Sequence, residues 1–454
     1  MIPLLEKSLI LSDVTTLRGR ETHKYVLMRE ELLQYIWKNV LYDSQNLMTS
    51  DGMPVQIIKH GDRNTDAGPD FFNAKIKIGE TLWAGNVEIH RRSSDWKRHL
   101  HNQNHLYDSV ILHVVYEHDM EITRTNGTVI PTLELSCDQN LMKIYDELLS
   151  RKTQIVVCKN QLTAIDPFHI GMWLERMLIE RLEQKTEKVG TVLSSTADNW
   201  EVSFNRLLVR SFGFNVNAQA FELLSASLPM SVMAKHKDSV FQLEAMLFGQ
   251  AGMLDDDCVD EYFLFLKKEY QFLKAKYSLS TMPASLWKYM RMRPANFPTI
   301  RIAQLAQLIY HSNSLLSKVI ECKNVDSIKG LFDVEVSVYW LTHFSFGKAS
   351  NFSTKHLGET AVRSILINAV IPVLFLYGKH NSNETISNKA LQFLEQLPFE
   401  NNEITRNWTE TGIECNNAAR SQALIHLYKN YCVEGKCLQC AIGDGLMRNM
   451  IRSI

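Results

Sequence analysis

The spacing of apolar residues changes once along this chain, and that change limits the folds that the chain can adopt. Between about Val55 and Leu135, apolar side chains alternate with polar ones or form short β-branched runs, as in strands. After about Cys137 they recur every three or four residues, as in helices. We therefore predict an α+β fold in which a sheet domain precedes a mainly helical part.

The length and composition allow several folded domains. The chain has 454 residues, of which 45% are hydrophobic and 22% are charged, so the composition is that of an ordinary globular protein. We expect an α/β domain over residues 1–140, a helical domain over 141–400 and a helical tail with a cysteine cluster over 401–454.

The charge balance and the apolar segments exclude several classes of protein. Lys and Arg number 49 against 50 Asp and Glu, so a nucleic-acid partner would have to be held by a local basic patch. Residues 1–20 lack the features of a secretory signal, and the most apolar window, 365–377, is too short to cross a bilayer. We expect a cytoplasmic protein without a membrane partner, in which this window is a buried helix.

The first part of the chain predicts a definite order of elements. A helix, three strands, a helix, a strand and a hairpin that turns at Asn126-Gly127 follow one another. The expected helices and single strands cover residues 30–42, 55–60, 72–78, 82–90, about 94–102 and 110–117.

Two carboxylates and a histidine are expected to converge on this sheet. Side chains alternate along a strand, so Glu88 and His90 project to the same face. A two-residue turn at Gly79-Glu80 would place Asp70 opposite Ile89. One extra residue, either in a three-residue loop or in a bulge with Gly85 as the candidate, would bring Asp70 opposite Glu88.

Such a pair of carboxylates is an oxygen-rich site that suits Mg²⁺ or Mn²⁺. Asp66 and Asn73 lie close to Asp70 in the sequence. They would either support the metal ligands from outside or shape the turn.

Pro69-Asp70, a gap of 17 residues and then Glu88-Ile-His90, set on this order of elements, resemble the PD-(D/E)XK nuclease core. The resemblance implies a restriction-endonuclease-like α-β-β-β-α-β domain, with Asp70 and Glu88 as ligands of a divalent metal. It also implies a metal-dependent nuclease that hydrolyses DNA or RNA. His90 stands where the family has Lys, and it could act as general base, third ligand or proton shuttle.

A second resemblance covers nearly the whole chain. It is similar to an uncharacterised bacterial family that is known only as a domain of unknown function, and this match implies no activity. The phrases that carry it are Asp66-Ala-Gly-Pro-Asp-Phe, Gly85-Asn-Val-Glu-Ile-His, Ser94-Asp-Trp, Ile111-Leu-His-Val-Val-Tyr, Arg291-Met-Arg-Pro-Ala-Asn-Phe-Pro and Tyr431-Cys to Cys440-Ala-Ile-Gly.

Two basic segments are candidates for binding nucleic-acid phosphates. Trp96 or Tyr107 could stack on a base, although Trp96 suits a buried core position better. The alternatives are a solvated helix face for the first segment and pairing with carboxylates or helix ends for the second. The candidate residues are Arg91, Arg92, Lys97, Arg98 and His101 in the first segment, and Arg291, Arg293 and Arg301 in the second.

The C-terminal tail carries a cysteine motif, Cys432-x4-Cys437-x2-Cys440. Its spacing suits a structural metal site, with Cys415 as the natural fourth ligand and His426 as the second choice. Zn²⁺ and a [4Fe-4S] cluster both fit four thiolates, while buried thiols or redox chemistry are the alternatives. The remaining cysteines, Cys137, Cys158, Cys258 and Cys322, are expected to be scattered core thiols.

These observations leave three functions open. The leading one is a metal-dependent nuclease. The second is a non-catalytic nucleic-acid-binding or assembly protein on a nuclease-like core. The third is a metal hydrolase of another substrate, with His90, His101 and His105 as ligands. The sequence contains no phosphate-binding loop, serine-hydrolase elbow or dinucleotide-binding glycine motif.

Overall fold

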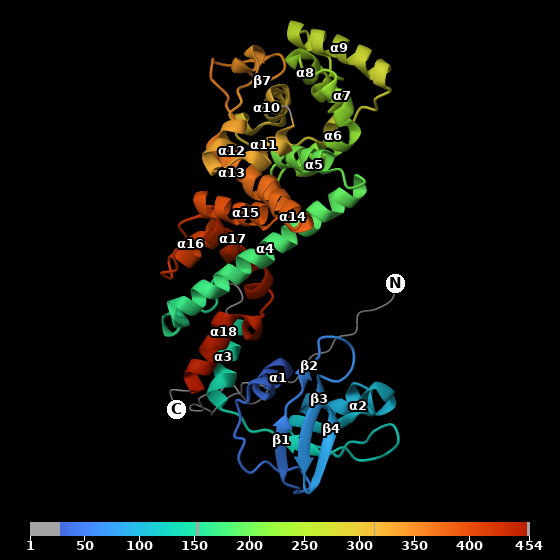
Figure 1. The fold of residues 1–454 in the computed structure, drawn as a ribbon, viewed down its shortest axis with the longest axis vertical. Helices are drawn as coiled ribbons and strands as arrows, with labels where there is room; N and C mark the ends of the chain where they lie inside the picture. Colours follow the sequence, from blue (N-terminus) through green and yellow to red (C-terminus); the bar gives the residue numbers. More distant parts are fainter. Residues whose placement is uncertain (1–27, 151–153, 313, 452–454) are drawn as a thin grey trace, which may run out of the picture. The chain divides into compact units, whose positions relative to one another are not determined.

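The computed structural model describes residues 28–150, 154–312 and 314–451, so the segment considered for a secretory signal lies outside the described residues. The chain divides into two compact units (Figure 1). Among the described residues, the sheet unit contains 28–150 and 443–451, and the helical unit contains 154–442. The division expected near residue 400 falls inside the helical unit.

The sheet unit is built on a mixed sheet whose strands run in the order β1-β3-β4-β5-β6. Neighbours are antiparallel up to β4, whereas β4-β5 and β5-β6 are parallel. The short strand β2 pairs with β3. The strands are β1 (Val55–Lys59), β2 (Asp62–Arg63), β3 (Phe71–Ile78), β4 (Thr81–Arg92), β5 (Val110–Glu117) and β6 (Thr132–Glu134).

The predicted order of helices and strands is confirmed. Helix α1 (Glu30–Asn39) precedes the sheet, and its apolar side is buried because Leu32, Leu33, Ile36 and Trp37 lie on one face. Helix α2 (Asp95–Arg98) lies in the crossover between the parallel strands β4 and β5. The predicted hairpin closes with a bridge between Thr123 and Val129, but β6 beyond it joins β5 in parallel.

The register between β3 and β4 shifts by one residue, as the convergence of the carboxylates requires. Near the turn Ile78 pairs with Thr81 and Ala74 with Gly85, whereas farther along Phe71 pairs with Val87. The extra residue lies on β3, where Asn73 has a left-handed φ of 57°.

Gly85 was the expected position of the bulge, and that placement was wrong. Gly85 instead allows β4 to pass close to the start of β5. A Cβ at this position would lie 2.4 Å from Ile111 Cγ2 and 2.7 Å from the Ser109 carbonyl oxygen.

The helical unit begins with the 29-residue helix α4 (Pro167–Ser195), to which Asp166 gives an N-cap. Its core is formed by apolar residues that recur at helical spacing along most of the helices. Two short strands, β7 (His343–Ser345) and β8 (Lys348–Ala349), pair with each other.

The other helices of this unit are α5 (Trp200–Phe212), α6 (Ala218–Ser227), α7 (Met230–Ala234), α8 (Val240–Gln250), α9 (Glu261–Tyr277), α10 (Pro298–His311), α11 (Leu315–Glu321), α12 (Val325–Leu331), α13 (Glu359–Ile365), α14 (Ile371–His380), α15 (Glu384–Gln396), α16 (Glu403–Thr409) and α17 (Ala418–Leu427). Two helices remain, α3 (Gln139–Ser150) in the sheet unit and α18 (Ala441–Ile451), which lies in that unit from Gly443 onward.

One helical run, Glu359–His380, is long and apolar enough to cross a membrane by length and composition. The expectation that this segment is too short for a bilayer was therefore wrong for the helix as a whole, because the apolar window continues into helical turns on both sides. Its most apolar 18-residue window is 72% buried inside the protein. Leu366–Val370 in its middle form a π-helical turn, and the run packs into the main core of the helical unit. The predicted burial of this segment is therefore confirmed.

Candidate metal centre

Asp70, which directly precedes β3, lies beside Glu88 on β4, as the shifted register requires. The Asp70 backbone N–H donates to Glu88 Oε2 at 3.0 Å, and the Ile89 backbone N–H donates to Asp70 Oδ2 at 3.0 Å. Gln34 of helix α1 donates to Asp70 Oδ1, also at 3.0 Å. Each carboxylate is thereby oriented by donors, while Glu88 Oε1 faces a group of histidines.

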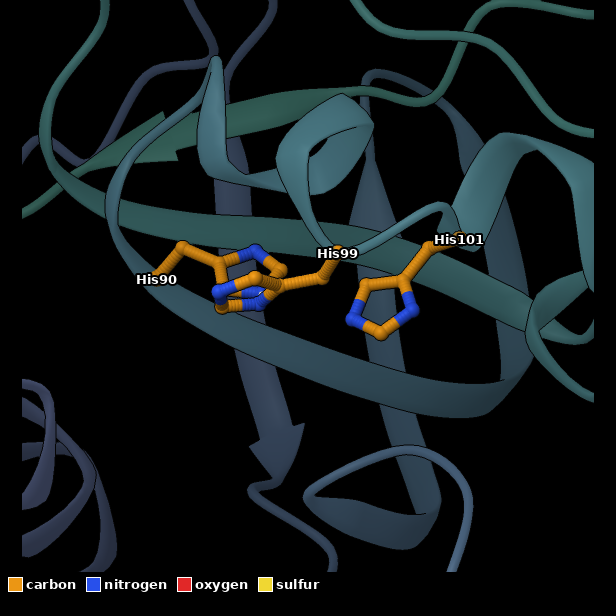
Figure 2. A group of neighbouring side chains, drawn as sticks. All are labelled: His90, His99 and His101. Carbon is orange, nitrogen blue, oxygen red and sulfur yellow. The ribbon is translucent and has the colours of Figure 1, made fainter.

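Three imidazoles gather beside Glu88 (Figure 2). His90 comes from β4, His99 follows α2 and His101 begins the next helical turn. His101 Nε2 lies 3.2 Å from Glu88 Oε1, and His90 Nε2 lies 3.6 Å from the same oxygen. His90 Nε2 also lies 3.1 Å from His99 Nδ1. One nitrogen of each imidazole lies within 4.8 Å of the others, so the three residues could hold a metal ion.

A fourth histidine supports the group from the core. His113 is fully buried on β5, and its Nε2 lies 2.8 Å from His90 Nδ1. His113 is therefore a hydrogen-bonded histidine of the core. A hydrogen bond at Nδ1 fixes the ring of His90 and leaves Nε2 facing Glu88 and His99. Metal-binding histidines are usually held in this way by a partner on the other nitrogen.

Burial controls the protonation of the carboxyl groups. Burial, followed by the charge of Glu88, raises the pKa of Asp70 to about 7. Burial raises the pKa of Glu88 to about 8. Glu30 on α1 responds in the same way, since burial and the charges of Asp70 and Glu88 raise its pKa to about 7. Without a cation, this site therefore resists the build-up of negative charge.

The same burial keeps the imidazoles neutral. It lowers the pKa of His90, with added repulsion from His113 and His101, and lowers that of His113 to about 3. The pKa values of His99 and His101 are also lowered, mainly by burial. Neutral imidazole is the form that binds metals, and a bound cation would favour the ionised carboxylates. His99 is exposed whereas His90 is 1% exposed, so the group opens to solvent on the His99 side.

The two residues expected near the metal ligands shape the backbone instead. Asp66 is exposed, and its backbone N–H donates to Asn64 Oδ1 in a local turn. Asn73 forms the bulge on β3, and its N–H donates to Asn86 Oδ1 at 3.2 Å. This arrangement fits the alternative in which both residues shape the turn and do not support the metal ligands.

The first basic segment is divided between the site and the surface. His101 is 9% exposed and belongs to the histidine group, so it is not a surface contact. Arg92 and Arg98 are exposed and form ion pairs with Glu117 and Asp95 at 2.9 and 2.8 Å. Lys97 is exposed and Arg91 is half-buried.

Trp96 is a core residue, as was expected in preference to stacking on a base. It is completely buried, and its indole N–H donates to the Thr123 carbonyl. Tyr107 stacks on His101 with the ring centroids 3.7 Å apart.

The arginines of the second segment do not form one surface. Arg291 and Arg293 are exposed, but Arg301 is 6% exposed and donates to Gln304 Oε1 and Asn296 Oδ1. Arg301 therefore stabilises the start of α10, and the prediction that it contacts nucleic acid was wrong.

The tail cysteines have a different fourth neighbour from the one expected. Cys432 interacts electrostatically with Cys440, Cys158 and Cys437, which together with burial raise the pKa of its thiol. The charges near Cys415 are those of Glu400 and Arg420. The structure thus places Cys158, and not Cys415, in the group.

His99 and Cys158 are the participants that sequence reasoning assigned to other roles. His99 lies within the first basic segment and was not predicted as a ligand, although the spacing His99-x-His101 is a signal for paired ligands. The third imidazole was expected from His105, beside His90 and His101, but the His105 side chain is 88% exposed and pairs with Asp108. Cys158 is far from the tail in sequence, so no local spacing could have identified it.

Comparison with known proteins identifies a family but no activity. The model of a family described as a protein of unknown function, DUF2851, matches residues 30–403. This range includes the carboxylates and the histidines and ends before the tail cysteines. No curated protein and no solved structure matches the chain.

Proposed function

Since the chain belongs to the DUF2851 family, whose description states no activity, we propose a function from its own residues: a metal-dependent phosphodiesterase that cleaves nucleic acid. The observation that carries the proposal is the convergence of Asp70 and Glu88 with His90 and His101 in one largely buried site. A site of this kind suits a divalent metal ion.

The donor set favours Mn²⁺ over Mg²⁺ as the bound ion. Asp70 and Glu88 supply carboxylate oxygens, which both ions accept, while His90 and His101 supply imidazole nitrogens, which suit Mn²⁺ better. When bound, such an ion lowers the pKa of a coordinated water and neutralises charge on a phosphate. His99 would accept the proton of the attacking water, because it is neutral, exposed and 3.1 Å from His90.

The arrangement of the sheet supports a nuclease. A helix, antiparallel strands that carry the two carboxylates, a helix and a parallel strand occur in the order that the resemblance to the PD-(D/E)XK core implies. The bulge at Asn73 brings Asp70 beside Glu88, and this convergence supports the proposal.

The surface near the histidines supports a polyanionic substrate. Between His90 and His99 the chain carries Arg92, Lys97 and Arg98, which are exposed. Exposed cations beside a metal site can hold the phosphates that flank the cleaved bond. Because Arg92 and Arg98 already pair with carboxylates, we expect these contacts to guide the substrate more than to select its sequence.

Two variants and a control test the proposal. Purified protein with Mn²⁺ should cleave at least one of single-stranded DNA, double-stranded DNA, branched DNA and RNA. Asp70→Asn and Glu88→Gln should each reduce the rate about a hundredfold or more, because each removes a metal ligand. Glu80→Gln, in the exposed β3–β4 turn, should leave the rate unchanged. Calorimetric titration with Mn²⁺ should show binding to the wild type and to Glu80→Gln only.

A second candidate is a metal hydrolase of another substrate, which the three closely spaced imidazoles favour. Binding of Mn²⁺ or Zn²⁺ that depends on His90 and His101, without cleavage of any nucleic acid, would support this candidate. Failure of both metal binding and cleavage would contradict both enzymes. It would favour a nucleic-acid-binding or assembly protein on the same fold.

A further inference from the structure

Three of the buried cysteines lie in one short stretch of the helical unit. Cys432 ends a π-helical turn, Tyr428–Cys432, that continues α17. The chain then reverses, with the Gly435 N–H donating to the Cys432 carbonyl at 3.2 Å. Cys437 begins a short 3₁₀ helix and Cys440 follows it, with a backbone hydrogen bond of 3.3 Å between the two residues. Tight turns of this kind bring the thiols of a C-x2-C motif to one side.

Cys158 completes the group from the other end of the helical unit's sequence. It directly precedes a 3₁₀ helix, Lys159–Ala164, that leads into α4, and α4 packs along α17. The thiol of Cys158 interacts electrostatically with those of Cys440 and Cys437, and the thiol of Cys432 interacts with all three others. Charge interactions of this kind require that the thiols lie near one another.

All four side chains are shielded from solvent. Cys158 is 7% exposed, and Cys432, Cys437 and Cys440 are each 8% exposed. Burial, followed by the charges of Cys440 and Cys437, raises the pKa of Cys158 to about 12. Four buried thiols gathered in this way match the four-cysteine ligand set of structural zinc and iron–sulfur sites.

We propose that Cys158, Cys432, Cys437 and Cys440 form a four-thiolate metal centre in the helical unit. Each thiol loses its proton as the metal binds, and the centre joins the tail to the start of α4. This centre is separate from the histidine site of the sheet unit and does not depend on the proposed nuclease function.

The spacing of the sulfurs favours an iron–sulfur cluster over a single zinc ion. Among the described residues, His90, His99 and His101 are the only group in which three possible ligand atoms all lie within 4.8 Å of one another. No three of the four cysteine sulfurs are therefore that close together. Four thiolates around one zinc ion would be about 3.8 Å apart, given a Zn–S bond of about 2.3 Å. A cluster of four irons spreads its thiolates more widely.

The test measures metal content in the full-length chain purified without oxygen. Iron and acid-labile sulfide in equal amounts, with a visible absorption band, are expected for the wild type. Cys158→Ser should lose most of the metal, because three thiolates hold such a centre poorly. Cys415→Ser is the matched control. Cys415 is 8% exposed, as are the tail cysteines, but its charged neighbours are Glu400 and Arg420 and not the other thiols. It should retain the full content.

A second measurement separates lost metal from lost folding. Cys158→Ser should keep the far-ultraviolet circular dichroism of the wild type, and its Mn²⁺ affinity at the histidine site should be unchanged. One zinc per chain that depends on the same four cysteines would support the centre and overturn the choice of iron. Full metal content in Cys158→Ser, or no metal in the wild type, would overturn the proposal.

Discussion

The Glu88 carboxyl group illustrates how one residue would link stability to binding of the proposed metal ion. It is 5% exposed, and burial raises its pKa from 4.5 to about 8, while that of Asp70 rises from 3.8 to about 7. As the pH rises from about 4, the unfolded chain loses these protons before the folded chain does. The contribution of both groups to the stability of the metal-free protein therefore falls until the pH passes about 8.

This linkage predicts opposite effects of Glu88→Gln with and without metal. At pH 8 the metal-free variant should unfold a few degrees higher than the wild type, because a neutral amide replaces a group that ionises at a cost. Near pH 4 the two proteins should unfold at similar temperatures. Mn²⁺ should stabilise the wild type increasingly as the pH rises and should not stabilise the variant. Thermal unfolding followed by circular dichroism measures all of these effects.

Equal melting temperatures of wild type and Glu88→Gln at pH 8, without metal, would contradict the raised pKa of Glu88. Glu80→Gln again serves as the control, since its side chain is 96% exposed and should show no such dependence.

The sequence predicts residues whose role follows from spacing along one strand or one turn. Glu88 and His90 were recognised because alternation along a strand places them on one face. Cys432, Cys437 and Cys440 were recognised because they share a local turn. Residues that reach a site from another element, such as Cys158, depend on how helices pack, and spacing carries no information about that packing.

At the scale of elements, the bulge in β3 decides where Asp70 lies. Asn73 adopts a left-handed φ of 57°, which Asn tolerates better than most residues and which glycine adopts freely. A β-branched side chain is strained in this conformation.

Two substitutions at Asn73 should therefore differ. Asn73→Gly should keep the register and the Mn²⁺ affinity. Asn73→Val should lower the free energy of unfolding by about 1–2 kcal/mol and weaken Mn²⁺ binding at least tenfold, because the strand slips or the bulge distorts. Urea unfolding and calorimetry measure the two effects. Equal Mn²⁺ affinity in both variants would show that the bulge does not position Asp70.

Element order could be predicted from the sequence, whereas the exact place of the irregularity could not. The strands Phe71–Ile78, Thr81–Arg92 and Val110–Glu117 follow from alternation and β-branched content. The need for an extra residue followed from requiring Asp70 to meet Glu88. Its assignment to Gly85 failed because a glycine also serves where two strands approach closely, and the sequence does not distinguish these uses.

For the whole molecule, the main feature is that the sheet unit contains residues from both ends of the described chain. Tyr35 on α1 donates its hydroxyl proton to Asp444 on α18 at 2.7 Å, and Arg448 donates to Asn39 at 2.5 Å. Tyr35 is 5% exposed, so its hydroxyl group depends on this acceptor.

Asp444→Ala should destabilise the sheet unit by about 1–3 kcal/mol, because the Tyr35 hydroxyl loses its partner. Hydrogen exchange followed by mass spectrometry should show faster exchange in α1, with the helices of the helical unit unchanged. Glu434→Ala, at an exposed position of the helical unit, should leave exchange in α1 at the wild-type rate. Unchanged protection of α1 in Asp444→Ala would show that α18 contributes little to the unit.

The return of α18 to the sheet unit has a consequence for biosynthesis. A ribosome releases residues 28–150 first, but their unit needs residues 443–451, which emerge only after the helical unit has been made. At the usual rate of synthesis this delay is about 15 to 60 seconds. During that interval α1 lacks the partner for Tyr35, so the nascent chain presents an incomplete unit to chaperones and proteases. A truncated translation product would then carry a finished helical unit and a sheet unit without α18, so the sheet unit is completed only when the whole message has been translated.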